Sequence, residues 1–265
     1  MTLRLRQICL ATPDLEPAVA TMQDVFGLAP CHRDAAVAKY GLVNALFVFG
    51  RQFLEIVAPA SGQADDSTAA GRFLQRTQGR GGYIAIFDTH DPERRQAHAE
   101  RLEIRVAHVM DVPGLFWGVQ LHPRDCRATM LEFDRSAGNE DPDGNYWPAG
   151  AHWQAHRRPD RATGIPWIEV ESPEPDALAA HWARIIDVPP EQGASGPQLR
   201  FDMGAVRFMR ATGAAPERMS GLAVAVPDPA RVLAHAAARG LPLHGRGFDF
   251  CGVTFLPQPS QGENP

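Results

Sequence analysis

The sequence predicts an α+β fold in which one strand–helix–hairpin unit is repeated along the chain. Short apolar runs typical of strands recur throughout, and a segment with helical spacing of apolar residues follows the first strand of each unit. This order occurs four times. Because internal repetition constrains a fold more than any local motif, we expect paired βαβββ units that form curled mixed sheets in two tandem domains.

The first unit starts with a strand-like segment over residues 3–12. A helix is expected up to residue 26, because Thr12 or Asp14 is suited to the N-cap and apolar residues follow at helical spacing. Two short apolar runs joined by a Gly-containing turn then predict a hairpin over residues 45–57. A polar loop is expected over residues 60–71.

The same order predicts the other three units. The second unit has a strand over residues 81–88, a charged helix over 91–103 and a hairpin over 116–134. The third and fourth units cover residues 164–211 and 220–258, and each again places a helix between a first strand and later strands. The repeated order indicates that the two halves of the chain share one architecture.

A segment rich in Gly, Pro, Asp and Arg separates the second unit from the third and predicts a domain boundary. We expect an N-terminal domain over residues 1–135, a linker over 136–163 and a C-terminal domain over 164–258. Trp147 and Trp153 indicate that the linker packs against another part of the protein.

The composition is that of an ordinary globular protein. The chain has 265 residues, 44% of them hydrophobic and 22% charged, with a formal net charge of −5. This balance gives no basic surface for nucleic acid or an anionic membrane. Four separated cysteines indicate reduced thiols, and no apolar run is long enough for a signal peptide or a membrane span, so we expect a cytoplasmic protein.

Two glutamates stand at equivalent places in the first two units. Glu55 lies in the middle of a strand whose neighbours Leu54 and Ile56 point to the opposite face, and Glu132 lies in the corresponding strand of the second unit. A carboxylate on an inner face is costly unless it is paired, hydrated or metal-bound. The pair therefore indicates a functional cleft; the structural alternative is a wet surface or a nearby arginine.

Three motifs resemble the vicinal oxygen chelate superfamily: RQICLATPDLEPAV, NALFVFGRQFLEIVAP and VQLHPRDCRATMLEFD. That superfamily includes glyoxalase I, methylmalonyl-CoA epimerase, extradiol dioxygenases and bleomycin-resistance proteins. The resemblance covers most of the chain and is best over residues 3–59 and 81–135. It implies the glyoxalase-like fold, in which two units pair and curl a mixed sheet around a cleft.

The resemblance also implies a divalent metal in the cleft, bound by side chains from the first and last strand of each unit. Those positions fall on Gln7, Glu55 and Glu132, with Tyr83 where the family usually has histidine. The first three are oxygen ligands, and the expected cofactor is a divalent metal (Mn, Fe, Zn, Ni or Mg) or none. Glu55 and Glu132 are also the candidates for catalytic proton transfer.

Four side chains are candidates for contact with a small-molecule ligand: Tyr83, His122, Asn44 and Cys9. Each has a structural alternative. Tyr83 could simply fill space, His122 could hydrogen-bond the turn before a proline, Asn44 could cap a turn, and Cys9 could be an inert thiol.

Two functions follow from the resemblance. The first is a glyoxalase-like enzyme of lyase, isomerase or dioxygenase type that acts on a small oxygenated substrate, with a divalent metal as an option. The second is a non-catalytic small-molecule binding protein of the bleomycin-resistance type without metal. The residue at position 83 discriminates between them, since an intact ligand set would favour the enzyme. The C-terminal pair of units is expected to be a degenerate copy, and a homodimer is left open.

Overall fold

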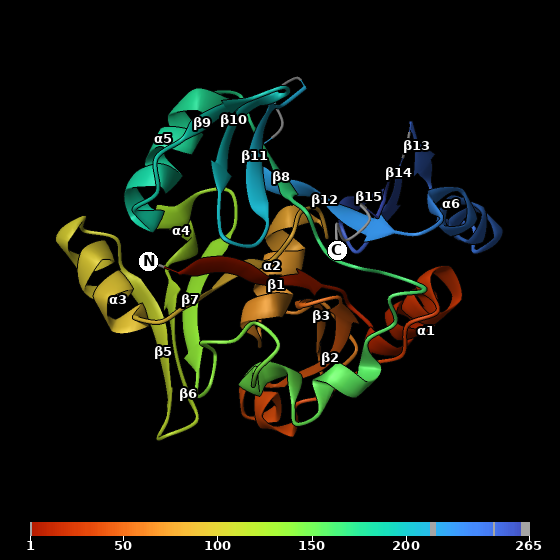
Figure 1. The fold of residues 1–265 in the computed structure, drawn as a ribbon, viewed down its shortest axis with the longest axis horizontal. Helices are drawn as coiled ribbons and strands as arrows, with labels where there is room; N and C mark the ends of the chain where they lie inside the picture. The colour runs from red at the N-terminus through yellow and green to blue at the C-terminus, as the bar shows by residue number, and fades with distance from the viewer. Residues whose placement is uncertain (1, 213–215, 246, 261–265) are drawn as a thin grey trace.

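The computed structural model describes residues 2–212, 216–245 and 247–260. Its two mixed β-sheets come from the two halves of the chain and occupy the lower and upper parts of Figure 1. Helices lie both at the outer sides of the molecule and near its middle in Figure 1. The α+β fold of paired units predicted from the sequence is confirmed.

The first sheet has seven strands in the order β2-β3-β1-β4-β7-β6-β5. β1 is parallel to β3, β4 is parallel to β7, and the central strands β1 and β4 run antiparallel to each other. The second unit therefore repeats the arrangement of the first across the β1–β4 junction. The bounds are β1 (Leu3–Ala11), β2 (Leu42–Phe49), β3 (Gln52–Pro59), β4 (Ile84–Thr89), β5 (Val106–Val112), β6 (Phe116–Leu121) and β7 (Met130–Ser136).

The second sheet has eight strands in the order β13-β14-β15-β12-β8-β11-β10-β9. β8 and β12 are antiparallel at its centre, and each is parallel to the last strand of its own unit, β11 or β15. The bounds are β8 (Ile168–Ser172), β9 (Glu191–Gly193), β10 (Gly196–Arg200), β11 (Ala205–Arg210), β12 (Arg218–Val226), β13 (Leu243–His244), β14 (Gly247–Phe250) and β15 (Val253–Pro259).

The first helix follows the predicted start and stop signals. Asp14 is the N-cap and its side chain accepts a hydrogen bond from the backbone N–H of Glu16, while Gly27 ends the helix with a φ of 69°. No helix within the described part of the chain is long and apolar enough to cross a membrane. The helices are α1 (Leu15–Phe26), α2 (Ala69–Thr77), α3 (Pro92–Arg101), α4 (Pro123–Cys126), α5 (Pro175–Ile186) and α6 (Pro229–Ala238). Short 3-10 turns are η1 (Ala35–Tyr40), η2 (Trp147–Ala149) and η3 (Trp153–His156).

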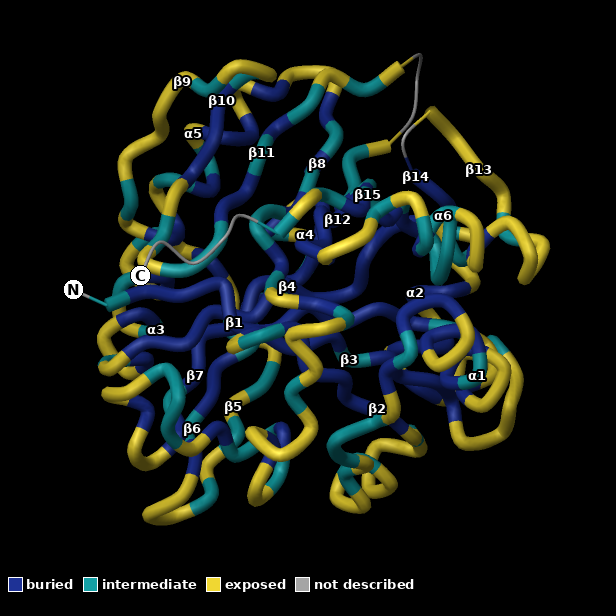
Figure 2. Tube along the Cα trace, turned by 45° about the vertical axis from the view of Figure 1, so that its right-hand side comes forward, coloured by how far each residue is buried: buried dark blue, intermediate teal, exposed yellow. Residues whose placement is uncertain are grey.

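Both sheets contribute to one continuous hydrophobic core. Ile8 and Phe133 of the first sheet belong to the same buried cluster as Val170 and Val224 of the second. Helices of the two halves also meet in pairs, α1 with α6 and α3 with α5. Figure 2 shows the strands mostly buried and the outer loops exposed. Because this core takes one face of the first sheet, the opposite face is left for a separate cavity.

The structure adds elements that the sequence did not predict. The expected polar loop over residues 60–71 is present up to Thr68, but its last three residues begin helix α2, which was not predicted. The strands β5, β9 and β13 each add one strand to the hairpins of units two, three and four. The first unit instead has a short isolated bridge between His32 and Leu46 at the place of such a strand. These added strands are short or half-exposed, so their apolar pattern is weak.

The segment that follows β7 packs closely against the first sheet. Tyr146 and Trp153 are fully buried, and the Tyr146 ring stacks on Phe53 at 4.7 Å between centroids. Arg4 of β1 donates a hydrogen bond to the carbonyl oxygen of Asn139 over 2.8 Å. This segment therefore closes one end of the sheet, in keeping with the packing role that its tryptophans indicated.

Candidate active site

Strand alternation determines which side chains of the first sheet face the cavity. On β1, Ile8 and Leu10 enter the core, whereas Gln7 and Cys9 line a cavity of about 980 Å³. All the candidates from the sequence lie around this one cavity. They are Gln7, Cys9, Asn44, Glu55, Tyr83, His122 and Glu132.

Glu55 is held by an amide group on each of its oxygens. Nδ2 of Asn44 donates to Oε1 over 2.7 Å, and Nε2 of Gln7 donates to Oε2 over 2.9 Å. Burial raises the pKa of Glu55, while hydrogen bonds from Asn44, Cys9 and Gln7 partly lower it. Glu55 is thus a carboxyl group with a fixed orientation and weakened acidity.

Glu132 is buried and receives a hydrogen bond from Gln120, whose Nε2 donates to Oε2 over 2.9 Å. Burial and, to a smaller extent, the negative charge of Glu55 raise the pKa of Glu132 to about 7, although the hydrogen bond from Gln120 opposes this shift. A group with a pKa near neutral can both accept and donate a proton. Glu132 is therefore well suited to general acid–base chemistry.

The strand register corrects the position that the sequence gave to Tyr83. Gln7 lies two residues before the residue of β1 that pairs with Glu55. The residue two places before the partner of Glu132 on β4 is Ile84. The position equivalent to Gln7 in the second unit is therefore occupied by the hydrocarbon side chain of Ile84, and Tyr83 precedes that position by one residue. The continuous apolar run of β4 contains no alternation that would fix its register in the sequence.

Tyr83 and Cys9 remain part of the cavity wall. The Tyr83 ring lies 5.0 Å from that of Phe73 on α2, measured between centroids. Burial raises the pKa of both the Tyr83 hydroxyl and the Cys9 thiol, so both are neutral at physiological pH. Cys9 therefore matches the inert thiol, and Tyr83 can offer a neutral hydroxyl to a ligand.

His122 and Asn44 both have structural tasks at the cavity. His122 is the N-cap of α4, and its Nδ1 accepts a hydrogen bond from the backbone N–H of Arg124 over 3.3 Å. Asn44 accepts a hydrogen bond from the backbone N–H of Asp34 over 2.8 Å while it donates to Glu55. Asn44 is thus a positioning residue for Glu55.

Three polar residues near the cavity were not singled out in the sequence. Gln120 lies directly across from Glu132 on β6. Asp134 follows Glu132 by two residues on the cavity face, and the Tyr146 hydroxyl donates to its Oδ2 over 3.1 Å. Arg6 lies at a bulge of β1, with its guanidinium 5.2 Å from the Tyr146 ring centroid. Because side chains two residues apart on a strand share a face, the position of Glu132 predicts that Asp134 also faces the cavity. Arg6 could not be found in this way, because nothing in the sequence marks the bulge at which it lies.

The oxygen atoms at the centre of the cavity fit a hard divalent cation. Oε1 of Gln7 is buried and has no hydrogen-bond partner, and Glu55 and Glu132 add carboxylate oxygens. Because Ile84 occupies the position equivalent to Gln7 in the second unit, only three protein side chains are candidate ligands. Within the described ranges, no group of three or more His, Cys, Asp or Glu residues forms a metal cluster, so an amide oxygen would have to complete the set.

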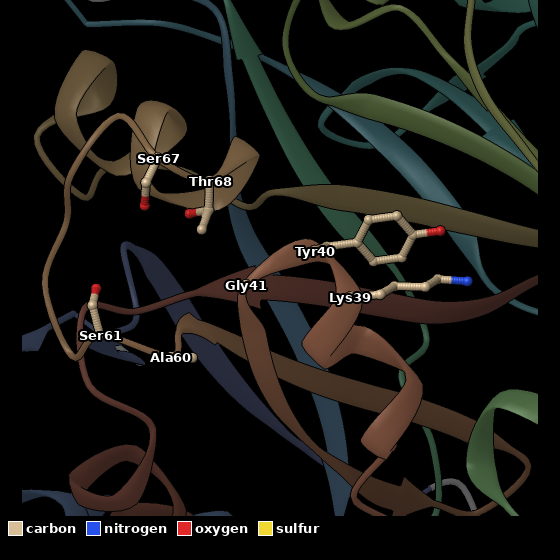
Figure 3. Close-up of a pocket in the computed structure, with 7 residues that line it drawn as sticks. All are labelled: Lys39, Tyr40, Gly41, Ala60, Ser61, Ser67 and Thr68. Atoms are coloured by element: carbon tan, nitrogen blue, oxygen red, sulfur yellow. The ribbon is translucent and has the colours of Figure 1, made fainter.

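A second hollow, of about 550 Å³, lies between η1 and the start of α2 (Figure 3). Its polar lining has local structural roles. Oγ of Ser61 donates to the carbonyl oxygen of Gln63, and Oγ1 of Thr68 accepts a hydrogen bond from the backbone N–H of Gly71 at the N-cap of α2. These contacts explain the hydroxyl groups without a ligand.

A family model described as a glyoxalase-like domain matches residues 8–186. This match covers more than half of the chain and includes both units that form the cavity. The chain belongs to the glyoxalase-like domain family. A search of curated proteins found no match.

Solved structures share the fold of this glyoxalase-like protein over nearly its whole length. A hypothetical protein from Staphylococcus aureus is 12% identical, with a TM-score of 0.64, and the match covers 98% of this chain and 100% of the other. The Mn(II)-bound glyoxalase from Novosphingobium aromaticivorans is 16% identical, with a TM-score of 0.61, over 96% of this chain and 81% of the other. At these identities the similarity establishes the fold alone.

Proposed function

We propose that the protein is a glyoxalase-like enzyme that moves a proton on a small oxygenated substrate bound in the cavity of the first sheet. The observation that carries this proposal is the pair of amide-held carboxyl groups, Glu55 and Glu132, on the wall of one cavity. Apolar side chains such as Ile84, Ile86 and Met130 surround them. A buried carboxyl group with a pKa near neutral, on the wall of a cavity, is typical of proton abstraction next to a carbonyl group.

Glu132 is the general base in this mechanism. Its carboxylate removes a proton from the carbon next to a substrate carbonyl and then returns it to the same or the neighbouring atom. Gln120 keeps the carboxyl group oriented through its hydrogen bond of 2.9 Å. Glu55, whose carboxyl group is oriented by Gln7 and Asn44, faces the same cavity. It can accept or donate the proton at a second position of the substrate.

A divalent cation would be held by Gln7, Glu55 and Glu132 together with water or substrate oxygens. When bound, it would supply a positive charge that stabilises a developing enolate oxygen. Oxygen ligands favour Mn²⁺ or Mg²⁺ over softer ions.

Glu132→Gln is expected to slow proton transfer at least 100-fold, because a glutamine amide cannot accept the proton. The measurement is deuterium incorporation from D₂O into a panel of α-hydroxy ketones, 2-oxo acids and 1,3-dicarbonyl compounds, followed by proton NMR. Glu100→Gln on the exposed surface of α3 is the matched control and should exchange as wild type. Binding of a panel member without exchange, or equal exchange in both variants, contradicts the enzyme and favours the non-catalytic binding protein.

Added Mn²⁺ is expected to raise the melting temperature of the wild-type protein. At a free concentration of 100 times the dissociation constant, binding to the native state adds about 2.7 kcal/mol to the free energy of unfolding. Glu55→Gln should lose most of this shift, because it removes one anionic ligand but keeps the shape. Glu100→Gln should keep the full shift. An equal shift in wild type and Glu55→Gln would place the ion elsewhere.

A further inference from the structure

Arginines, most of them exposed, are frequent in the wall of the cavity. Six of them line it, from α2 and the residues after it, from the α4 turn, and from the start of β12 in the second sheet. We call this set the arginine rim: Arg72, Arg76, Arg80, Arg124, Arg127 and Arg218. The rim thus brings both halves of the chain to the wall of one cavity.

Only part of this positive charge is neutralised by acidic side chains. Arg127 pairs with Glu217 over 2.5 Å, and Arg218 pairs with Glu171 over 3.0 Å. Across the described ranges, the other four rim arginines have no carboxylate within ion-pair distance.

Two of those four have neutral acceptors. Arg72 donates to the carbonyl oxygen of Asp66 over 2.7 Å, and Arg80 donates to Oε1 of Gln78 over 3.2 Å. The Arg76 guanidinium lies 5.9 Å from the Phe73 ring centroid. The rim therefore keeps positive charge available to a ligand.

The remaining acidic groups of the cavity come from other elements than the rim arginines do. Asp34 belongs to the turn before η1, where its side chain accepts from the backbone N–H of Ala36. Glu55, Glu132 and Asp134 come from the strands of the sheet. The cavity wall therefore has carboxyl groups mainly on the strands of the first sheet and guanidinium groups on the segments beside that sheet.

Tyr83 lies between the two kinds of group. Its ring is 5.0 Å from the Phe73 ring, and the Arg76 guanidinium lies 5.9 Å from that same Phe73 ring. On its other side, the backbone N–H of Tyr83 donates to the carbonyl oxygen of Cys9, the strand partner of Glu55. A ligand in contact with Tyr83 would reach the rim on one side and the carboxyl pair on the other. The cavity volume of about 980 Å³ is enough for a ligand with two such parts.

We propose that the arginine rim binds an anionic group, a phosphate or a carboxylate, carried by the same ligand whose oxygenated end meets Glu55 and Glu132. This inference rests on the proposed function for the inner end only. Guanidinium groups form paired hydrogen bonds with both kinds of anion. The rim would hold the ligand by its charged end and so select substrates with an anionic tail over neutral ones.

The test is isothermal titration calorimetry with pyrophosphate and with citrate as separate probes. The wild-type protein should bind at least one of them, and the double variant Arg72→Gln/Arg76→Gln should bind at least tenfold more weakly. The control is Arg101→Gln/Arg184→Gln, which removes two exposed helix arginines outside the cavity and should bind as wild type. Binding should weaken as salt is added, because the rim is exposed.

The two probes distinguish the sources of the anion. Tighter binding of pyrophosphate indicates a phosphate-bearing ligand, and tighter binding of citrate indicates a carboxylate. No binding of either probe, or equal binding by both double variants, overturns the proposal. Glu132→Gln should still bind the preferred probe, so the failure of the proton-transfer mechanism and the failure of the anion site give different results.

Discussion

Replacing Arg4 by methionine is expected to lower the free energy of unfolding by about 3–5 kcal/mol. Arg4 and Asp88 are both buried, with 2.8 Å between Nη1 and Oδ2. Methionine keeps much of the apolar stem but leaves the Asp88 carboxylate without its positive partner. It also removes the hydrogen bonds from Arg4 to the carbonyl oxygens of Asn139 and Glu140, which attach the segment after β7 to the first sheet.

Urea unfolding of three variants measures this effect. Arg4→Met/Asp88→Asn should recover part of the loss, because the uncompensated charge is gone and an amide oxygen can still accept from Asn139. Arg33→Met is the matched control: Arg33 pairs with Glu16 over 2.6 Å, but both side chains are exposed, so its loss should cost no more than about 1 kcal/mol. A loss below that level for Arg4→Met would contradict the structural role of the buried pair.

The fold was predictable because its repeated unit leaves a strong local pattern. The first helix has both its N-cap Asp14 and its final Gly27 in the sequence, and the strands that enter the core are continuous apolar runs. β5 was not predicted, because only one of its faces packs against the protein and it contains the polar residues His108 and Asp111. Helix α2 was not predicted either, because it directly follows a polar loop and buries only four of its nine residues.

The candidate site was predictable only where strand alternation identifies a side chain. It placed Glu55 and Glu132 on the cavity face, because their neighbours enter the core. It could not assign their partners, since the hydrogen bonds to Glu55 from Gln7 and Asn44 depend on how three strands align. The rim had no local signal at all, because Arg218 is far from α2 in the chain.

Glu132→Gln is expected to stabilise the protein at pH 8 and to leave its stability nearly unchanged near pH 4. Burial raises the pKa of Glu132 from 4.5 to about 7 in the folded protein. Below pH 4.5 the group is protonated in both the folded and the unfolded state, so it makes no difference. As the pH rises towards 7, the unfolded chain releases the proton while the folded protein keeps it, and the wild type loses stability.

Above pH 7 this loss reaches about 3 kcal/mol, since each pKa unit corresponds to 1.36 kcal/mol. Glutamine carries no charge and keeps an oxygen that can accept the hydrogen bond from Gln120, so the variant avoids the loss. Denaturant unfolding at pH 4, 6 and 8 should therefore show a difference in the free energy of unfolding that grows with pH, whereas Glu100→Gln should stay within about 0.5 kcal/mol of wild type throughout.

If Glu132→Gln were destabilised at pH 8, the carboxylate would have to be stabilised by a positive partner, and a bound cation between Glu55 and Glu132 would be the direct candidate. Repeating the pH 8 measurement with a chelator separates these cases, because removal of such a cation should restore the stabilising effect of the substitution.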